Sequence, residues 1–194
     1  MRYILASGSP RRKELLSMVV PEYEVIPAKG EEKTSEQTPD AIVEELSYHK
    51  ASEIFNKILR DEKDGFVVIG ADTVVSYKQK ILGKPKDRSD AADMIRLLQG
   101  HEHQVYTGVT VFYREEEENK SFTFSECTNV KVTDMTEDEI TSYAGCGEPD
   151  DKAGAYALQG KFGIYITGID GDYYNVVGLP VARLYHELKD HGLL

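Results

Sequence analysis

Three consecutive cations, Arg11, Arg12 and Lys13, lie in the first turn of a predicted helix near the start of the chain. Ser9 is a residue type that often caps helices, and Pro10 suits the first helical position. A helix N-terminus carries partial positive charge and favours anions, so cations there conflict with the helix dipole. A bound phosphate would use the free backbone N–H groups and also neutralise the arginines. Phosphate binding and a solvated basic turn are both compatible with this stretch.

Lys50 is a cation in an apolar position. It falls on the apolar face of the helix predicted over 40–59, four residues after Leu46 and four before Ile54. Such a lysine either extends its ammonium to the edge of the apolar surface or points into a cleft, where it contacts an anion.

Asp72 is a carboxylate between two predicted strand segments, 66–69 and 74–77. A carboxylate in such surroundings is costly unless it is paired, protonated or bound to a metal. Because ligand sites in α/β sheets favour the ends of strands, we interpret Asp72 as a general base or a Mg²⁺ ligand. The alternative is an aspartate that accepts hydrogen bonds from neighbouring backbone amides.

Two further segments carry polar groups that suit a ligand. Lys84 is held just before a proline, which favours an extended backbone, and the Walker A frame is missing around it. The segment 148–160 mixes glycines, acids and a lysine, as a loop that contacts a small ligand does. Taken alone, each segment is more simply read as an ordinary turn.

Together these residues suit a polyphosphate and a hard divalent metal, which prefers oxygen ligands. No residue set resembles a Ser–His–Asp or Cys–His nucleophile arrangement. Water activated by a metal and a carboxylate is therefore the economical mechanism. The candidate cations are Arg11, Arg12, Lys50 and Lys84, and the candidate carboxylates are Glu32, Asp72 and Asp151.

The elements that must position these residues alternate between strand and helix. The 194 residues suit one domain or two closely joined lobes. A long hairpin is predicted from strands 105–113 and 121–132 across an acidic turn, and Thr136 to Glu139 reads as a capping box. These patterns predict an α/β fold with a mixed sheet. Further helices are predicted from residue 10, from Ser89 to about 99 and over 179–189, and further strands over 3–6, 22–26 and 163–169.

Charge and composition exclude several classes of protein. The net charge of −11 argues against non-specific binding to nucleic acids or to anionic membranes. No apolar run approaches the roughly 20 residues that span a bilayer. The apolar stretch at the N-terminus is too short for a signal peptide. The two cysteines suggest no disulfide framework. We therefore expect a cytoplasmic protein.

The chain as a whole resembles the Maf family, first described as septum-formation proteins and now regarded as nucleoside triphosphate pyrophosphatases. The resemblance covers nearly all of the 194 residues. Six ordered motifs are a far more specific signal than any one of them. The motifs are ILASGSPRRKELL at 4–16, GADTVV at 70–75, LGKPKD at 82–87, VYTGV at 105–109, DKAGAYALQG at 151–160 and IDGDYYNVVGLP at 169–180.

The resemblance implies a fold and a reaction. The implied fold is α/β, with a mixed twisted sheet, flanking helices and two lobes around a central cleft, similar to that of inosine triphosphate pyrophosphatases. Residues 1–194 would form a single nucleotide pyrophosphatase domain. The implied reaction cleaves a nucleoside triphosphate between its α- and β-phosphates, with a divalent cation such as Mg²⁺ or Mn²⁺. The monophosphate and pyrophosphate are the products, in a house-cleaning role for the nucleotide pool.

The resemblance also assigns roles to single residues. The aspartate of GADT, Asp72, would be the proton acceptor. The acidic residue after the second strand corresponds to Glu32, but the sequence around it departs from the commoner Asp-Glu pair, which leaves the choice between Glu31 and Glu32 open. The implied substrate contacts are Ser7, Arg11, Arg12, Lys50 and Lys84, and the implied metal ligands are Glu32, Asp72 and Asp151.

Base preference follows from three positions in the family. One branch prefers dTTP and UTP, and another prefers a methylated GTP. The discriminating positions of the pyrimidine branch correspond to Arg11, Thr73 and Gln159, and this sequence has the residues of that branch. A glutamine amide suits this role because it can both donate and accept at a base edge. The resemblance thus implies dTTP and UTP, and modified pyrimidine nucleotides stay an open alternative.

Two other functions stay open from the sequence. The first is a non-catalytic nucleotide-sensing or partner-binding protein of cell division, which the presence of Asp72, Lys50 and Lys84 disfavours. The second is a purine pyrophosphatase for ITP, which the set of Arg11, Thr73 and Gln159 disfavours by resemblance. The expected partner is a nucleoside triphosphate substrate, without nucleic acid or membrane, and a homodimer is an open alternative because dimers are known in the family.

Overall fold

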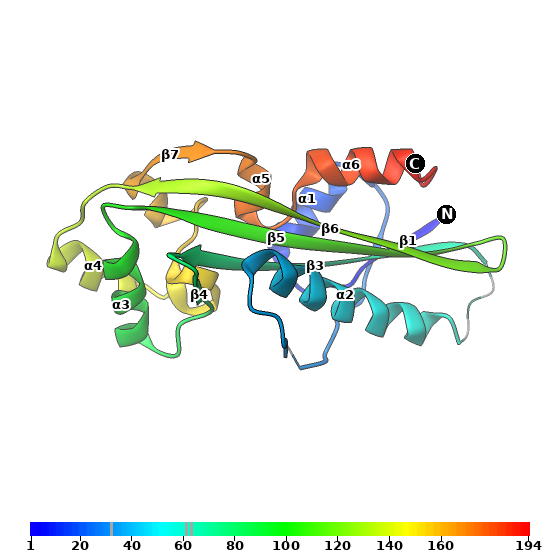
Figure 1. Ribbon diagram of the computed structural model, residues 1–194, viewed down its shortest axis with the longest axis horizontal. Coiled ribbons are helices and arrows are strands. Elements are labelled where there is room, and N and C mark those ends of the chain that lie inside the picture. Colours follow the sequence, from blue (N-terminus) through cyan, green and yellow to red (C-terminus); the bar gives the residue numbers. More distant parts are fainter. Residues whose placement is uncertain (32, 61, 63) are drawn as a thin grey trace. The chain divides into compact units, whose positions relative to one another are not determined.

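The computed structural model describes every residue of the chain except 32, 61 and 63 (Figure 1). In this described part, a seven-stranded mixed sheet has the order β2-β1-β3-β5-β6-β7, and β4 pairs with β3. Helices flank the sheet, so the predicted α/β class with a mixed sheet is confirmed. The chain divides into two compact units, one of Met1–Asp72, Thr107–Glu126 and Gly178–Leu194, and the other of Thr73–Tyr106 and Cys127–Val177.

The first unit contains the parallel part of the sheet. Strand β1 (Arg2–Leu5) pairs in parallel with β2 (Glu24–Val25) and with β3 (Phe66–Tyr77), and Leu5 lies opposite Ile69. The helices of this unit are α1 (Pro10–Ser17), α2 (Pro39–Ile58) and α6 (Val181–Asp190). The predicted start of α1 and both predicted ends of α2 and α6 agree with these helices to within two residues.

Helices α2 and α6 cover opposite faces of the long hairpin β5 (Glu102–Glu115) and β6 (Glu118–Val132). In Figure 1, α2 is drawn below these strands and α6 above them. The Ser125 hydroxyl donates to Glu44 Oε1 of α2 at 2.6 Å, whereas the ring of its neighbour Phe124 lies 4.6 Å from the Arg183 guanidinium of α6. Successive side chains of a strand point to opposite faces, so the two helices sandwich the sheet.

Two glycines within strands let α2 lie directly on the sheet. A Cβ atom at Gly70 of β3 would lie 2.6 Å from the Ser47 carbonyl oxygen of α2. A Cβ atom at Gly108 of β5 would lie 2.3 Å from the Val43 carbonyl oxygen. Only a residue without a side chain allows the helix backbone to approach this closely. The apolar core below the contact is formed by Ile4, Ala51, Ile54, Phe55, Phe66 and Val68.

The second unit packs its helices around the other ends of the long strands. Helix α3 (Arg88–Leu98) contacts α4 (Glu137–Ala144) and two short 3₁₀ segments, η1 (Pro149–Asp151) and η2 (Ala153–Ala155). Strand β4 (Lys80–Leu82) pairs antiparallel with β3, and β7 (Ile166–Asp170) pairs antiparallel with β6. The remaining elements are the 3₁₀ segment η3 (Lys161–Tyr165) and helix α5 (Tyr173–Val177).

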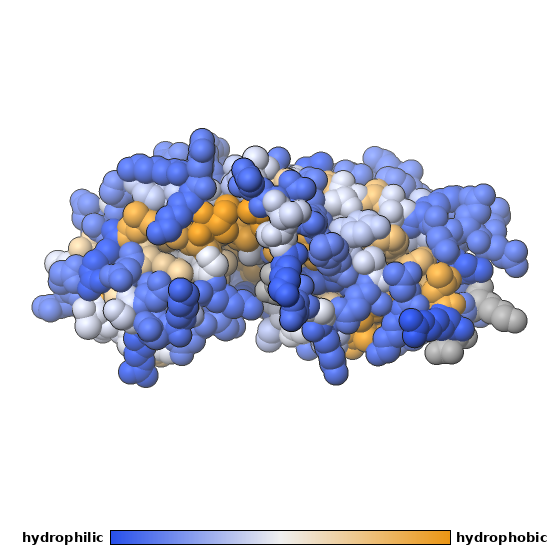
Figure 2. Space-filling model, turned by 60° about the horizontal axis from the view of Figure 1, so that its bottom comes forward, coloured by the Kyte–Doolittle hydropathy of each residue, from blue (hydrophilic) through white to orange (hydrophobic). Residues whose placement is uncertain are grey.

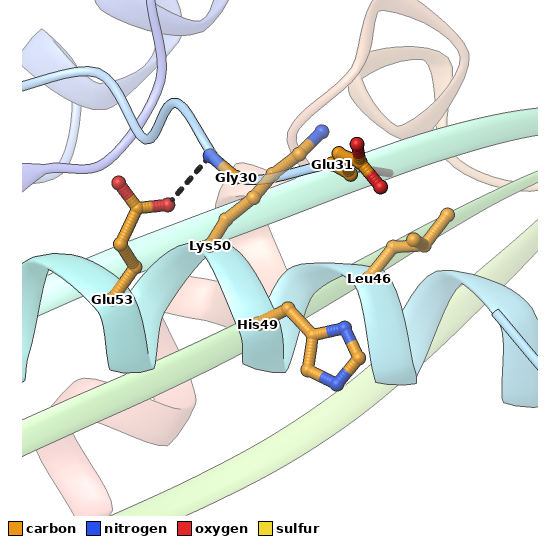
Figure 3. A pocket seen from close by; sticks show the side chains of 6 residues that line it. All are labelled: Gly30, Glu31, Leu46, His49, Lys50 and Glu53. Atoms are coloured by element: carbon orange, nitrogen blue, oxygen red, sulfur yellow. Dashed lines mark hydrogen bonds between the residues drawn. The ribbon is translucent and has the colours of Figure 1, made fainter. Parts of the chain in front are cut away.

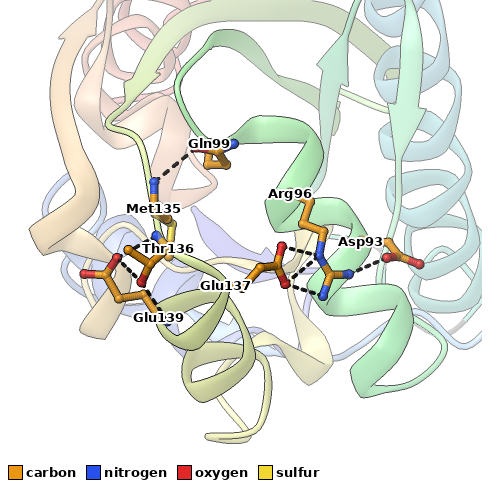
Figure 4. Close-up of polar contacts among 7 residues, drawn as sticks. All are labelled: Asp93, Arg96, Gln99, Met135, Thr136, Glu137 and Glu139. Carbon is orange, nitrogen blue, oxygen red and sulfur yellow. Dashed lines mark hydrogen bonds and ion pairs between the residues drawn. The ribbon is translucent and has the colours of Figure 1, made fainter.

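Polar contacts fix the ends of α3 and α4 (Figure 4). Arg96 of α3 pairs with Glu137 of α4, with an Nε–Oε1 distance of 2.9 Å, and this hydrogen bond raises the pKa of Arg96 and lowers the pKa of Glu137. The predicted capping box is confirmed, because Glu139 N donates to the Thr136 hydroxyl and the Glu139 carboxylate accepts from Thr136 N. The predicted cap of α3 at Ser89 is wrong: Asp87 holds that position and accepts from Asp90 N at 2.9 Å.

Three predicted strand boundaries are corrected. The segments 66–69 and 74–77 form one continuous strand, β3, that runs through Asp72. The last strand begins at Ile166, because η3 occupies the residues before it. The hairpin strands are longer than expected, since β5 and β6 leave only Glu116 and Glu117 between them, with φ values of 46° and 70°.

Figure 2 shows a face that is coloured mainly as hydrophilic, with a smaller apolar area. In the part of the chain that the structure describes, no helix combines the length and the apolar composition needed to cross a membrane.

Candidate active site

The packing of α2 on β3 brings Lys50 to Asp72. Gly70 and Asp72 are two apart on the strand and therefore point to the same face. Gly70 contacts the α2 backbone at Ser47 and Ala51. Asp72, the next residue on this face of the strand, therefore lies close to Lys50. Lys50 Nζ donates to Asp72 Oδ1 at 2.5 Å.

The Lys50–Asp72 pair is largely withdrawn from solvent. The side chains are 18% and 11% exposed, respectively. A carboxylate buried to this degree requires a cation or hydrogen-bond donors, and Lys50 supplies both. Our expectation that Asp72 lies at the end of a strand is wrong, since β3 continues to Tyr77. Within the protein, the ammonium of Lys50 reaches the carboxylate of Asp72, and its contact with a ligand anion stays a prediction.

Lys50 also lines a small pocket on the surface of α2 (Figure 3). The pocket has a volume of about 110 Å³. Figure 3 shows Lys50, Glu53 and His49 projecting from the helix and Gly30 on the loop beside them. Glu53 holds this loop, because its carboxylate accepts from Gly30 N at 2.9 Å. A charged pocket of this kind suits a polar ligand. The lining residues are Gly30, Glu31, Leu46, His49, Lys50 and Glu53.

Ser7 and Arg12 form a second polar group in the same unit. Arg12 Nη1 donates to the Ser7 hydroxyl at 3.3 Å, and Arg12 Nε donates to the Gly178 carbonyl at 2.8 Å. The predicted cap position of Ser9 is confirmed, but its side chain makes no capping hydrogen bond. Arg11 and Arg12 are both half-buried. Helix α1 therefore begins at Pro10, as predicted, with both arginines in its first turn. The Arg12 side chain reaches back to Ser7 in the loop before the helix.

The two polar groups share one end of the parallel strands. Ser7 follows β1 by two residues beyond Leu5, and Asp72 lies three residues beyond Ile69, the partner of Leu5. The Ala6 N–H donates to the Ile69 carbonyl at 2.8 Å, so the pairing extends past Leu5. The candidate ligand contacts at this end thus come from the loop after β1 and from α1, β3 and α2.

The candidates Thr73, Lys84, Asp151 and Gln159 belong to the second unit, where three motifs meet. Gly154 N donates to the Gly83 carbonyl at 3.0 Å, which joins the segment of Asp151 and Gln159 to that of Lys84. A Cβ atom at Gly154 would lie 2.8 Å from Val75 Cγ2, so this loop also rests on β3 just after Thr73. The side chains of Lys84, Asp151 and Gln159 are exposed there.

The candidate metal ligands do not form a cluster in the described residues. Glu32 lies outside the described part of the chain, whereas Glu31 is exposed and pairs with Lys33. Asp151 pairs with Lys152. Within the residues that are described, no three His, Cys, Asp or Glu side chains gather as a metal site. Mg²⁺ typically binds through one or two carboxylates plus substrate phosphates, and the buried carboxylate of Asp72 fits that mode.

Sequence reasoning missed four residues that build the site. Gly70 and Gly108 set the position of α2, and Tyr143 and Glu148 hold the segment around Gln159, as described below. A glycine inside a strand pattern is a signal of close backbone approach, so the two glycines were open to prediction. Nothing in the sequence distinguishes Tyr143 or Glu148 from other polar residues.

A buried histidine beside the site predicts a pH dependence of stability. His103 Nε2 lies 2.8 Å from the Tyr156 hydroxyl, and burial lowers the pKa of His103 to about 4. Between pH 4 and 6.5 the unfolded chain binds this proton and the folded chain does not, so stability rises with pH across this window. We expect the free energy of unfolding to fall by about 2 kcal/mol more in the wild type than in His103→Gln between pH 7.5 and 5. Urea denaturation at both pH values measures this, and equal losses in the two proteins would contradict it.

Comparison with known proteins gives close relatives over the full chain. The family described as Maf-like protein matches residues 2–191. Proteins named dTTP/UTP pyrophosphatase from Agathobacter rectalis and Lachnoclostridium phytofermentans are 51% and 50% identical, each over 98% of this chain and over 97% and 95% of their own length. One of the same name from Bacillus cereus is 45% identical over 99% of this chain and 96% of its own. The Ham1 protein structure of Staphylococcus aureus matches 98% of this chain and 100% of its own at 11% identity, with a TM-score of 0.49.

Proposed function

Because the chain belongs to the Maf family, we propose that it is a nucleoside triphosphate pyrophosphatase that hydrolyses dTTP and UTP to the monophosphate and pyrophosphate. Relatives that carry this activity in their names match nearly the whole chain. The observation that carries the proposal is the Lys50–Asp72 pair, which puts a carboxylate and an ammonium 2.5 Å apart. It lies at the same end of the paired strands β1 and β3 as the start of α1 with its two arginines. A house-cleaning role in the nucleotide pool follows from this reaction.

In the proposed mechanism, Asp72 accepts the proton of the attacking water. The water attacks one phosphorus of the α–β anhydride, and its proton moves to the Asp72 carboxylate as the new P–O bond forms. The bridging P–O bond breaks in the same displacement, which leaves the nucleoside monophosphate and pyrophosphate. Lys50 carries three N–H donors, so it can bond a phosphate oxygen while it still donates to Asp72. Ser7, Arg11 and Arg12 bind phosphate oxygens at the start of α1, where the free backbone N–H groups add further donors.

A divalent cation, Mg²⁺ or Mn²⁺, would enter as part of the metal–nucleotide substrate, because the buried carboxylate of Asp72 suits a metal that is held mainly by phosphates. Asp72 would hold it, with Asp151 and one of Glu31 and Glu32 as further carboxylates. When bound, such an ion neutralises charge on the phosphates and on the leaving pyrophosphate. The arginines and Lys50 perform the same electrostatic task from the protein side.

Base selection is proposed for Arg11, Thr73 and Gln159, with Lys84 as a further phosphate contact. Uracil and thymine present an N–H donor next to a carbonyl acceptor, and the carboxamide of Gln159 offers the complementary pair. Gln159 is exposed, so its amide is accessible to a ligand.

A panel of nucleoside triphosphates tests the proposal. Pyrophosphate release is measured from dTTP, UTP, CTP, GTP and ITP with Mg²⁺ or Mn²⁺, and we expect the highest kcat/KM for dTTP and UTP. Preference for ITP or GTP would contradict the base assignment while it leaves the reaction intact. Binding of dTTP without release of pyrophosphate from any nucleotide would contradict the enzyme and favour a nucleotide sensor.

A further inference from the structure

A buried tyrosine and a glutamate hold the turn that carries Gln159. The turn spans Ala157 to Gly160, where Gly160 N donates to the Ala157 carbonyl at 3.1 Å. Tyr143 projects from α4 and is 5% exposed, and its hydroxyl donates to Glu148 Oε1 at 2.9 Å. Both residues come from segments before the turn in the sequence and meet it through side chains.

The two side chains bond the turn at both of its ends. On the N-terminal side, Ala157 N donates to the Tyr143 hydroxyl oxygen at 3.3 Å. On the C-terminal side, Lys161 N donates to Glu148 Oε2 at 2.9 Å, and Phe162 N donates to Oε1 at 3.4 Å. Gln159 therefore lies between two anchored backbone positions, and we call Tyr143 and Glu148 the turn clamp.

The direction of each hydrogen bond in the turn clamp is fixed by chemistry. Burial, and then the hydrogen bond to Glu148, raises the pKa of Tyr143, so its hydroxyl keeps its proton. That proton goes to the carboxylate, which leaves a lone pair of the hydroxyl for Ala157 N–H. Tyr143 thus bonds the N-terminal end of the turn and Glu148 the C-terminal end, and the Tyr143–Glu148 hydrogen bond joins the two. A change at either residue breaks this joint and weakens the hold on the turn.

Gly160 shows how closely the turn clamp fits. A Cβ atom at this position would lie 2.3 Å from the Glu148 carboxylate. The Tyr143 ring also packs against the Phe162 ring, with centroids 4.9 Å apart. The turn is therefore held by polar bonds at its ends and by an apolar contact beyond it. Gln159 itself stays exposed at the tip.

We propose that Tyr143 and Glu148 are positioning residues for base selection, which fix the backbone of the Ala157–Gly160 turn so that the Gln159 amide meets a uracil or thymine edge. This inference rests on the proposed function. A fixed turn holds the Gln159 amide within hydrogen-bond reach of the base edge, whereas a mobile turn weakens this contact and with it the discrimination between uracil and cytosine. The turn clamp thus acts on specificity and not on the chemical step.

The test is the selectivity ratio, defined as kcat/KM for UTP divided by kcat/KM for CTP. Tyr143→Phe removes the shared hydroxyl and keeps the ring, and Glu148→Gln replaces one of the two accepting oxygens. We expect either variant to lower the ratio about 10-fold, the effect of one or two lost hydrogen bonds, mainly through a higher KM for UTP. The kcat for UTP should stay within about 3-fold of the wild type, because Asp72 and Lys50 are untouched.

Tyr165→Phe is the matched control. Its ring lies 5.5 Å from Phe162, as a neighbour of the same cluster, and its hydroxyl is not part of the turn clamp. The control should keep the wild-type ratio. An unchanged ratio in both clamp variants would overturn the inference, as would a loss of kcat alone at constant ratio. A wild type that cleaves no nucleotide would overturn the proposed function and the inference with it. The wild-type rates therefore separate a failure of the proposed function from a failure of the inference alone.

Discussion

Replacing Asp72 with asparagine should lower kcat for pyrophosphate release from dTTP by about 10²- to 10⁴-fold, the range expected for loss of a general base. The asparagine side chain has the same shape, and its carbonyl oxygen still accepts from Lys50 Nζ, which lies 2.5 Å from the carboxylate oxygen in the wild type. The fold should therefore persist, because the contact that joins α2 to β3 keeps a hydrogen bond. What is lost is the ability to take a proton from water.

Initial rates, melting temperature and dTTP affinity together decide this prediction. Asp190→Asn, at the exposed end of α6, makes the same chemical change away from the site and should leave kcat unaltered. Calorimetric titration should show that Asp72→Asn still binds dTTP, since the arginines of α1 are intact. A variant that keeps more than about a tenth of the wild-type kcat would exclude Asp72 as the general base.

Replacing Gly108 or Gly70 with alanine should remove a large part of the free energy of unfolding. The new Cβ atom would lie 2.3 Å from the Val43 carbonyl oxygen in the first case and 2.6 Å from that of Ser47 in the second. Both contacts are with the backbone of α2, which cannot rotate away as a side chain does. We expect each alanine variant to lose about 3 kcal/mol or more of unfolding free energy. Activity should fall as well, because α2 carries Lys50.

Gly83→Ala is the control for this prediction, since a Cβ atom there would meet nothing within 4 Å. Its unfolding free energy should stay within about 0.5 kcal/mol of the wild type. Urea denaturation followed by circular dichroism compares the three variants. Equal stability of Gly108→Ala and Gly83→Ala would show that α2 does not rest on the sheet in the way described.

The sequence predicted most helices because their signals are local. The apolar period of α2, the proline at the start of α1 and the capping box of α4 each lie within one short segment. Strand β3 was divided in two because Gly70 and Asp72 are residue types that strands avoid. The structure shows the reason for both exceptions: Gly70 makes room for α2, and Asp72 pairs with a lysine of the same helix.

The site could be predicted in part, because some of its residues stand out within their own short segments. Lys50 and Asp72 were recognisable singly, because each is charged among apolar neighbours. Their pairing was not, since it depends on how a helix 22 residues away in sequence packs on the strand. The resemblance supplied Ser7 and Gln159, which no pattern of period or charge singles out. Tyr143 and Glu148 act through contacts that form only once the second unit has folded.

The products formed from dTTP test the central claim most directly. Purified protein is incubated with dTTP and Mg²⁺, and the nucleotide and phosphate products are separated and quantified, with Asp72→Asn prepared in parallel to detect contaminating enzymes. We predict equal amounts of dTMP and pyrophosphate from the wild type and neither above background from the variant. Formation of dTDP and phosphate, or equal product from both proteins, would contradict cleavage of the α–β anhydride by this site.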